Sequence, residues 1–472
     1  MSVESAPLAV GFDLDMTLID TVPGFARVLE VLGEELGVAF PVDEMTSKLG
    51  PPLEMMLEPF LPAEEIGPAG DRFRALYPEH AIDSVPVLPG AHEALAAVRR
   101  HRGRTVVVTG KYPDNARRHQ DHLGLDVDVL EGWVWGVGKA EVLTREGCSM
   151  YVGDHVHDVE GALAAGVLSV SVLTGGSTRE ELLEAGTHVV LDSLAEFPAW
   201  LDEHLLAVRL DALEADLRSR GSVLVAYSGG ADSAFLLAAA VRALGAENVV
   251  AATGYSHSLP EVERDPARRF AEALGVEVLT PETHEMEREG YRANGADRCF
   301  FCKAELVDVL ASLAASRGLS VVATGTNADD AVAGFRPGIR AADERGAVAP
   351  LRDAGLTKAQ VRAASRAWDL PTWDKPAAAC LSSRVAYGVE VTPHRLARVE
   401  RAEAAVRAVL AGVRDLRVRD LGDRASVEVD AALLPLDADV ESLVLAGVRS
   451  SGFAEAAVDP RGFRSGAMNE AL

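Results

Sequence analysis

The sequence is poor in cysteine, in basic charge and in long apolar runs. Only four cysteines occur in 472 residues, which excludes a disulfide scaffold and favours a reducing, cytoplasmic location. Acidic residues outnumber basic ones by 72 to 46, and the net charge of −26 argues against general nucleic-acid binding. No run approaches the ~20 apolar residues of a membrane helix, so no membrane partner is expected. The N-terminus, Met1-Ser-Val-Glu-Ser, carries no basic n-region, so no secretory signal is expected.

What the sequence does contain is enough for two or three globular domains. Hydrophobic residues make up 48% and charged residues 25%, an ordinary globular composition. Apolar strand candidates alternate with helical segments rich in Ala, Glu and Leu, which predicts parallel, doubly wound sheets. In the first block the expected strands are 8–12, 105–109, 150–152, 169–173 and 189–191, with helices at 91–100 and 158–165. In the second block they are 223–227, 249–253, 277–279 and 321–323.

We therefore predict an α/β protein with two doubly wound parallel-sheet domains and a small C-terminal α+β region. The predicted domains are residues 1–202, 203–386 and 387–472. The join near residue 202 is inferred from motifs, because no linker rich in Pro, Gly or Ser marks it. The second domain opens with a helix pattern at 203–218, and the third contains a helix at 394–410 and β-like stretches at 416–420 and 426–429.

Two carboxylates, Asp13 and Asp15, stand at the end of the first predicted strand. Strand alternation puts both on one side of the chain, at the carboxyl end where α/β sites form. Close carboxylates invite a divalent cation, because neither balances the charge of the other. Three further signals follow in order: Thr109 before Gly110 at a strand end, Lys139 before a helix, and Gly153-Asp154-His-Val-His-Asp158 after another strand.

These four motifs together resemble the phosphatases of the haloacid dehalogenase (HAD) superfamily, with a fold of the Rossmann type, and 89–95 resembles their phosphoglycolate phosphatase-like branch. The resemblance implies that Asp13 is a nucleophile that forms an aspartyl-phosphate and that Asp15 is the general acid and base. It implies that Thr109 and Lys139 hold the phosphoryl group. Mg²⁺ would be held by Asp13, the main chain of Asp15 and Asp154, with support from Asp158. Residues from about 20 to 85 would form a helical cap that selects a phosphorylated small molecule. A HAD fold without activity is the alternative.

A second motif, Ser228-Gly-Gly-Ala-Asp-Ser233, lies between the apolar run 223–227 and a helix-like segment. This order directs backbone N–H groups and a helix N-terminus at an anion, and the glycines let a phosphate approach the backbone. The hexapeptide resembles the PP-loop of enzymes that cleave ATP to AMP and pyrophosphate. A Gly-Ser turn that binds nothing is the alternative. The candidate nucleotide ligands are Ser228, Gly229, Gly230, Asp232 and Ser233.

Three thiols accompany this loop. Cys299 and Cys302 lie in Arg-Cys-Phe-Phe-Cys-Lys, and Cys380 begins Cys-Leu-Ser-Ser-Arg. A lone CxxC suits zinc, redox or Fe–S chemistry, but without a second pair a closed Cys₄ zinc site is not expected. With Gly-Thr-Asn-Ala-Asp-Asp at 325–330, Arg-Pro-Gly at 336–338 and Gly-Leu-Thr-Lys at 355–358, the chain from 205 to about 430 resembles the LarE family of ATP-dependent sulfur transferases, which serve nickel-pincer nucleotide biosynthesis.

The resemblance implies that ATP adenylates a carboxylate of pyridinium-3,5-biscarboxylic acid mononucleotide and that sulfur then displaces AMP. The sulfur comes either from a sacrificed Cys380 or from a sulfide on the open iron of a [4Fe–4S] cluster held by Cys299, Cys302 and Cys380. The three cysteines favour the cluster. The resemblance also suggests a homo-oligomer and a sulfide-donor protein as partners.

The same family assigns the phosphate and carboxylate end of the substrate to residues near the C-terminus. Guanidinium groups match phosphate and carboxylate geometry, although solvated strand arginines are the alternative. The stretch Asp420-Leu-Gly422 departs from the family by lacking a histidine before its glycine. The assigned residues are Arg384, Arg417, Arg419 and Glu428.

The sequence thus predicts a bifunctional enzyme, a Mg²⁺-dependent phosphatase fused to an ATP-dependent sulfur transferase. Two alternatives stay open. One is a PP-loop tRNA thiolation enzyme with a fused phosphatase, which the acidic charge disfavours. The other is a regulatory protein that binds nucleotides without turnover. Covalent linkage alone suggests that the phosphatase acts on a pyridine mononucleotide or AMP of the same pathway.

Overall fold

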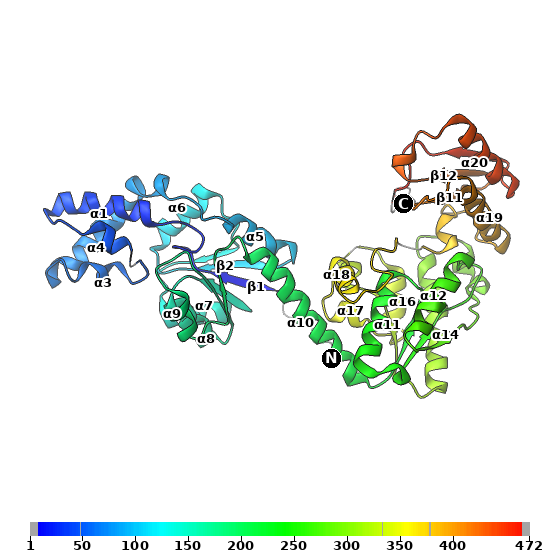
Figure 1. Cartoon of the computed structure of the whole chain (residues 1–472), viewed down its shortest axis with the longest axis horizontal. Helices are drawn as coiled ribbons and strands as arrows, with labels where there is room; N and C mark the ends of the chain where they lie inside the picture. The colour runs from blue at the N-terminus through cyan, green and yellow to red at the C-terminus, as the bar shows by residue number, and fades with distance from the viewer. Residues whose placement is uncertain (1–7, 48, 333, 377–378, 465–472) are drawn as a thin grey trace. The chain divides into compact units, whose positions relative to one another are not determined.

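The computed structural model describes residues 8–47, 49–332, 334–376 and 379–464. The chain forms two compact units, which we call the N-terminal unit (Ala6–Leu205) and the C-terminal unit (from Leu206 onward) (Figure 1). The first residues, for which no secretory signal is expected, lie outside the described part. In the described ranges no helix has the length and apolar character needed to cross a bilayer.

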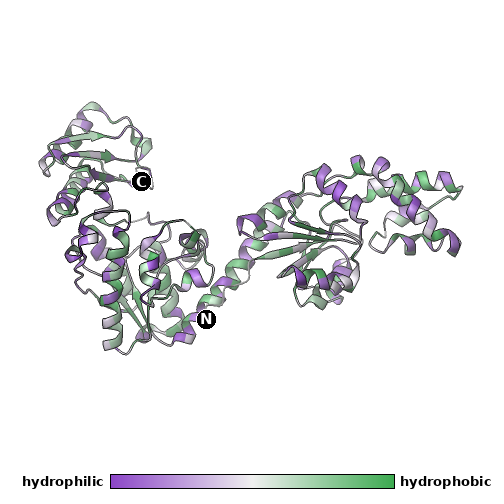
Figure 2. Cartoon of the chain, turned by 180° about the vertical axis from the view of Figure 1, so that it is seen from behind, coloured by the Kyte–Doolittle hydropathy of each residue, from purple (hydrophilic) through white to green (hydrophobic). Residues whose placement is uncertain are grey.

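The N-terminal unit is built on a six-stranded parallel sheet in the order β3-β2-β1-β4-β5-β6. The central strand β1 pairs with β2 and β4, and all four of its residues are buried. Such burial is typical of a parallel sheet, because helices cover both of its faces. Figure 2 shows the apolar colour concentrated on such strands. The carboxyl ends of β1, β2 and β4 therefore meet at one edge. The strands are β1 (Ala9–Phe12), β2 (Arg104–Val108), β3 (Val129–Glu131), β4 (Met150–Gly153), β5 (Leu168–Val172) and β6 (Val189–Leu191).

Helices follow each strand of this sheet, and a helical insertion between β1 and β2 has an apolar core of its own that includes Phe25, Leu29 and Phe73. We call this insertion the cap. Its elements are α1 (Val22–Leu36), α2 (Val42–Thr46), α3 (Leu53–Leu57), α4 (Ala63–His80) and η1 (Ile82–Ser84). The remaining helices are α5 (Ala91–Arg100), α6 (Pro113–Leu123), η2 (Gly136–Gly138), α7 (Lys139–Arg145), α8 (Val156–Ala165) and α9 (Arg179–Glu184).

One helix, α10 (Phe197–Arg220), crosses the boundary between the units. Leu201 near its start belongs to the core of the N-terminal unit. Leu213 and Leu217 near its end belong to the core of the C-terminal unit. The helix starts six residues before the predicted 203, because Phe197 and Leu201 are needed to close the first core.

The C-terminal unit contains a four-stranded parallel sheet in the order β10-β7-β8-β9. Its strands are β7 (Val223–Ala226), β8 (Val249–Ala252), β9 (Glu277–Leu279) and β10 (Val321–Thr324). The surrounding helices are α11 (Ala231–Leu244), η3 (Ala246–Asn248), α12 (Glu261–Ala273), η4 (Glu285–Glu287), α13 (Glu289–Arg292), α14 (Arg298–Ser316), α15 (Ala328–Val332), α16 (Pro337–Asp343), α17 (Pro350–Asp353), α18 (Lys358–Ala367) and η5 (Leu381–Arg384).

A small mixed sheet follows, in which β12 pairs antiparallel with β11 and parallel with β13. Its elements are α19 (Pro393–Val409), β11 (Arg417–Asp420), β12 (Arg424–Glu428), η6 (Ala431–Leu433), α20 (Ala438–Ser450) and β13 (Glu455–Val458). The predicted fold class is confirmed: two doubly wound parallel sheets and a small α+β part. Strands β3 and β13 were not predicted, because they are short and no residue in either is buried.

Candidate active sites

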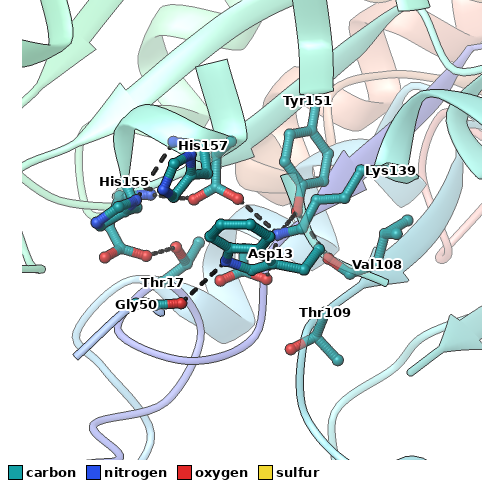
Figure 3. Close-up of polar contacts among 12 residues, drawn as sticks. Asp13, Thr17, Gly50, Val108, Thr109, Lys139, Tyr151, His155 and His157 are labelled. Atoms are coloured by element: carbon teal, nitrogen blue, oxygen red, sulfur yellow. Dashed lines mark hydrogen bonds and ion pairs between the residues drawn. The ribbon is translucent and has the colours of Figure 1, made fainter. Parts of the chain in front are cut away.

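The first site lies where β1, β2 and β4 end, and its centre is the ammonium group of Lys139. This group donates to Asp13 Oδ1 at 2.9 Å, to Asp158 Oδ1 at 2.6 Å and to the Tyr151 hydroxyl at 2.8 Å (Figure 3). Lys139 starts α7 and is 3% exposed. Asp154 follows β4 and accepts a hydrogen bond from the Thr17 hydroxyl at 2.8 Å. The structure thus brings three of the predicted carboxylates, Asp13, Asp154 and Asp158, together with the predicted lysine.

Three of these carboxylates form a candidate metal centre. Ligand atoms of Asp13, Asp154 and Asp158 lie within 4.8 Å of one another, and all three residues are buried. Burial, followed by the nearby charges of Asp158 and Asp15, raises the pKa of Asp13 to about 7 despite the opposing effect of Lys139. Burial and the charge of Asp158 likewise raise the pKa of Asp154 well above its usual value. A divalent cation would relieve this repulsion, so the donor set fits one.

Asp15 faces a different set of partners. It accepts from Lys111 Nζ at 2.6 Å, from the Thr21 hydroxyl, and from the Thr109 hydroxyl at 3.5 Å. Burial alone would raise the pKa of Asp15, but the charge and hydrogen bond of Lys111 outweigh it and lower the pKa. The Asp15 side chain therefore turns to a lysine and not to the carboxylate cluster. The predicted catalytic and metal-binding roles of these residues stay predictions.

Sequence reasoning missed Lys111 and Tyr151. Lys111 also lies 4.7 Å from the centre of the Tyr77 ring, so it links the cap to Asp15. Its signal was present in the sequence, because it comes two residues after Thr109 at the same strand end. The Tyr151 hydroxyl donates to Val108 O at 2.7 Å and accepts from the buried lysine. No signal in a single sequence marks a tyrosine inside an apolar strand as part of a site.

The second site is the loop between β7 and the N-terminus of α11. Gly229 adopts a φ of 70°, which glycine reaches without the strain of a side chain. The Ser233 hydroxyl accepts from Ser228 N at 3.3 Å and lies 3.1 Å from the Ser228 hydroxyl. Gly230 N donates to the Ser228 hydroxyl at 3.4 Å. A Cβ on Gly325 would lie 2.8 Å from Ser233 N, so the 325–330 motif packs directly under the loop.

Two charged residues, Asp232 and Lys375, lie at this loop. Among the residues that the structure describes, the buried Asp232 Oδ1 has no hydrogen-bond partner, and burial raises the pKa of Asp232. A cation carried with a nucleotide would satisfy this oxygen. Lys375, which sequence reasoning did not single out as a ligand, donates to Gly229 O at 2.9 Å and to Glu263 Oε2 at 2.6 Å.

A cavity of about 400 Å³ joins this loop to two of the thiols. Burial, then the charge of Cys380, raises the pKa of Cys302 far above its usual value. Desolvation and Cys380 also raise the pKa of Cys299, although that residue is exposed overall. The three cysteines therefore lie within electrostatic reach of one another. The cavity lining includes Ser228, Gly230, Asp232, Ser233, Cys302, Lys303 and Cys380.

The predicted anion-binding arginines form a cluster beside Cys380. Arg384 donates to Cys380 O at 2.9 Å and to Glu403 Oε1 at 2.9 Å. Arg419 pairs with Glu428 Oε2 at 2.9 Å. Burial and the neighbouring charge of Arg384 lower the pKa of Arg417 to about 10. Among the described residues that line the 400 Å³ cavity, none of the four predicted ligands Arg384, Arg417, Arg419 and Glu428 appears, so their role in binding substrate stays a prediction.

Known families match both units. The haloacid dehalogenase-like hydrolase family matches residues 10–129, and the HAD-hydrolase-like family matches 138–197. The NAD synthase family matches residues 206–385. A phosphoglycolate phosphatase of Rhodospirillum rubrum is 31% identical over 221 residues, which cover 41% of this chain and 91% of that protein.

Two further relatives each match 57% of this chain. An uncharacterized protein of Synechocystis sp. is 38% identical over 270 residues, 99% of its length. Pyridinium-3,5-bisthiocarboxylic acid mononucleotide synthase of Lactiplantibacillus plantarum is 33% identical over 267 residues, 96% of its length. The folds and the two sites define a HAD-type hydrolase joined to a PP-loop enzyme. Through the second part, the chain belongs to the LarE family of ATP-dependent sulfur transferases.

Proposed function

We propose that the chain is a bifunctional enzyme of nickel-pincer nucleotide biosynthesis. Its C-terminal unit would make a thiocarboxylate from a carboxylate of pyridinium-3,5-biscarboxylic acid mononucleotide, the chemistry that the name of the Lactiplantibacillus relative implies. Its N-terminal unit would hydrolyse a phosphate monoester. One observation carries the first part: Cys302 and Cys380 line the same cavity as the phosphate-binding loop. A mononucleotide product in the relative's name favours this function over tRNA thiolation.

The loop and the N-terminus of α11 would bind the phosphates of ATP through backbone N–H groups. Asp232, whose Oδ1 has no hydrogen-bond partner in the described part of the chain, would hold the Mg²⁺ that comes with the nucleotide. A carboxylate oxygen of the substrate attacks the α-phosphorus, and the bond to pyrophosphate breaks. The resulting mixed anhydride is a good electrophile. Sulfide attacks its carbonyl carbon, AMP leaves, and the thiocarboxylate remains.

The three cysteines would hold a [4Fe–4S] cluster. Cys302 and Cys380 line the nucleotide cavity, and electrostatic interactions link them to Cys299. Three thiols suit such a group, which when bound offers an open iron for a sulfide. Positive charge there would favour the thiolate form of the cysteine ligands, against the effect of burial on the thiols of Cys299 and Cys302. A cytoplasmic, reducing location suits this site, and a partner protein would supply the sulfide.

In the N-terminal unit, Asp13 would attack the phosphorus and Asp15 would protonate the departing oxygen. Asp15 would then take a proton from the water that hydrolyses the aspartyl-phosphate. Lys139 and Thr109 would hold the phosphoryl oxygens. Mg²⁺ on Asp13, Asp154 and Asp158 would offset the negative charge of the phosphoryl group.

The test of the cluster compares iron, sulfide and the visible spectrum in protein purified without oxygen. We expect about four irons per chain, with broad absorption near 400 nm (roughly) of the kind that Fe–S clusters give. Cys380→Ala should lose both. Cys148→Ala is the matched control, because Cys148 is buried in the N-terminal unit. An iron-free wild type that sulfurates its substrate once per chain would point instead to a sacrificed Cys380.

A further inference from the structure

The cavity beside Asp13 has an aromatic wall. It has a volume of about 280 Å³ and lies between the carboxylates and the cap. Six of the 27 described residues that line it are aromatic, whereas aromatic residues make up only 5% of the chain. Three of them, Phe25, Phe73 and Tyr77, belong to the core of the cap. The other three are Tyr112, Trp133 and Trp135, which come from the segments that follow β2 and β3.

Trp133 is held in an unusual conformation. Its φ is 62° and the residue is 62% exposed. A bulky residue in the left-handed region is strained, and strain of this kind concentrates at binding sites. Its ring meets Tyr112 edge to face at 5.1 Å, and the Arg74 guanidinium lies 5.6 Å from its centre. A large, rigid and exposed ring therefore stands at the cavity.

Trp135 extends this aromatic wall to the site expected to bind the phosphoryl group. Its indole N–H donates to Gly50 O of the cap at 3.1 Å, and its ring lies 4.2 Å from the ring of His157. A Cβ on Gly110 would lie 3.6 Å from Trp135 Cδ1. Because Gly110 directly follows Thr109, the aromatic wall begins next to the residue expected to hold the phosphoryl group.

The cations of the cavity are already committed to carboxylates. Lys111 pairs with Asp15 and Lys139 pairs with Asp13, while Arg74 pairs with Glu54 and with Asp71 at 3.3 Å. Within the described lining every lysine and arginine thus pairs with a carboxylate. A small phosphorylated acid such as 2-phosphoglycolate would bring a second anionic group that competes with these pairs, whereas a neutral aromatic ring would not.

We propose that the phosphatase site takes phosphate monoesters that carry a neutral aromatic base, namely nucleoside 5′-monophosphates, and that Trp133 stacks on the base. This rests on the proposed phosphatase function. Attack by Asp13 on the phosphorus breaks the bond to O5′, which receives its proton from Asp15. Water then releases inorganic phosphate and restores Asp13, so AMP and water give adenosine and phosphate. AMP is also the leaving group of the sulfur transfer proposed for the other unit, so the phosphatase would consume a product of its own chain.

The test compares AMP with ribose 5-phosphate, which lacks only the base, and with 2-phosphoglycolate. Phosphate release is measured in the full chain, and Asp13→Asn gives the blank, so that nucleotide bound in the other unit does not contribute. We expect kcat/KM for AMP to exceed that for ribose 5-phosphate by about tenfold, the scale of one stacked base. Trp133→Ala should remove this preference and leave ribose 5-phosphate within about twofold of wild type.

Two matched variants sharpen the result. Trp133→Gly suits the left-handed φ and removes the ring without strain, so it should behave like Trp133→Ala. Val137→Ala changes another exposed residue of the same segment outside the cavity lining and should keep the preference for AMP. Equal turnover of AMP and ribose 5-phosphate, or an equal loss with every ester in Trp133→Ala, would overturn the substrate class while the phosphatase stands. No Asp13-dependent release from any ester would remove the phosphatase itself, and the substrate class with it.

Discussion

Replacing Lys139 by methionine tests the electrostatic design of the carboxylate site. The ammonium group makes three polar contacts in a buried position. Methionine keeps the unbranched stem of the side chain, one atom shorter, but leaves Asp13 and Asp158 without their cation. Removing one partner of a buried ion pair costs about 3–5 kcal/mol. For a unit of this size each kcal/mol lowers Tm by about 2–4 °C, so the transition of the N-terminal unit should fall by on the order of 10 °C.

Scanning calorimetry in the presence of a chelator measures this change, because the C-terminal unit supplies an internal reference. Added Mg²⁺ should restore more stability to Lys139→Met than to the wild type, since the vacated space leaves three carboxylates to a cation. Phosphatase kcat should fall by about 10²–10³-fold. Arg145→Met is the control, because Arg145 lies on the same helix and, among the described residues, its side chain forms ion pairs at the surface, where such pairs contribute little to stability. A Tm within 2 °C (roughly) of wild type would refute the reasoning.

Two further changes test other parts of the molecule. Gly325→Ala places a Cβ 2.8 Å from Ser233 N, so we expect it to lower the free energy of unfolding by about 1–3 kcal/mol. Titration calorimetry should show weaker ATP binding. An unchanged affinity for ATP would contradict the tight packing at this position. Burial and the charge of Lys111 lower the pKa of His119 to about 3, so the unfolded chain binds the extra proton first as pH falls. Below pH ~6.5 the free energy of unfolding should therefore fall by about 1.4 kcal/mol per pH unit because of this residue. Denaturant titrations should show that His119→Gln removes this loss of stability. The control His122→Gln, at an exposed position, should keep it.

The parallel sheets and the positions where their strands end were predictable, because short apolar runs lead directly into site motifs. β1 and β7 are buried throughout, and each leads directly into a motif at its carboxyl end. The strand predicted at 105–109 is Arg104–Val108 instead. Thr109 comes directly after it, and its hydroxyl donates to Asp15 in the site.

Side-chain partners across the fold were not predictable. The pairing of Arg419 with Glu428 depends on the register of β11 and β12, which no local pattern fixes. The contacts of Lys111 with Asp15 and Tyr77 join three separate segments. Strain at Trp133 leaves no mark in the sequence either, because a left-handed φ at a bulky residue contradicts its own local preference.

The continuity of α10 has a consequence for dissecting this protein. Because its first turns complete one hydrophobic core and its last turns complete the other, no cut within Phe197–Arg220 yields two intact halves. A fragment that stops at residue 202 lacks Leu205, and a fragment that starts near Val223 lacks Leu213 and Leu217. The halves are best separated as overlapping fragments that both carry the helix. Cleavage of α10 by a protease would therefore remove part of the hydrophobic core from both units at once.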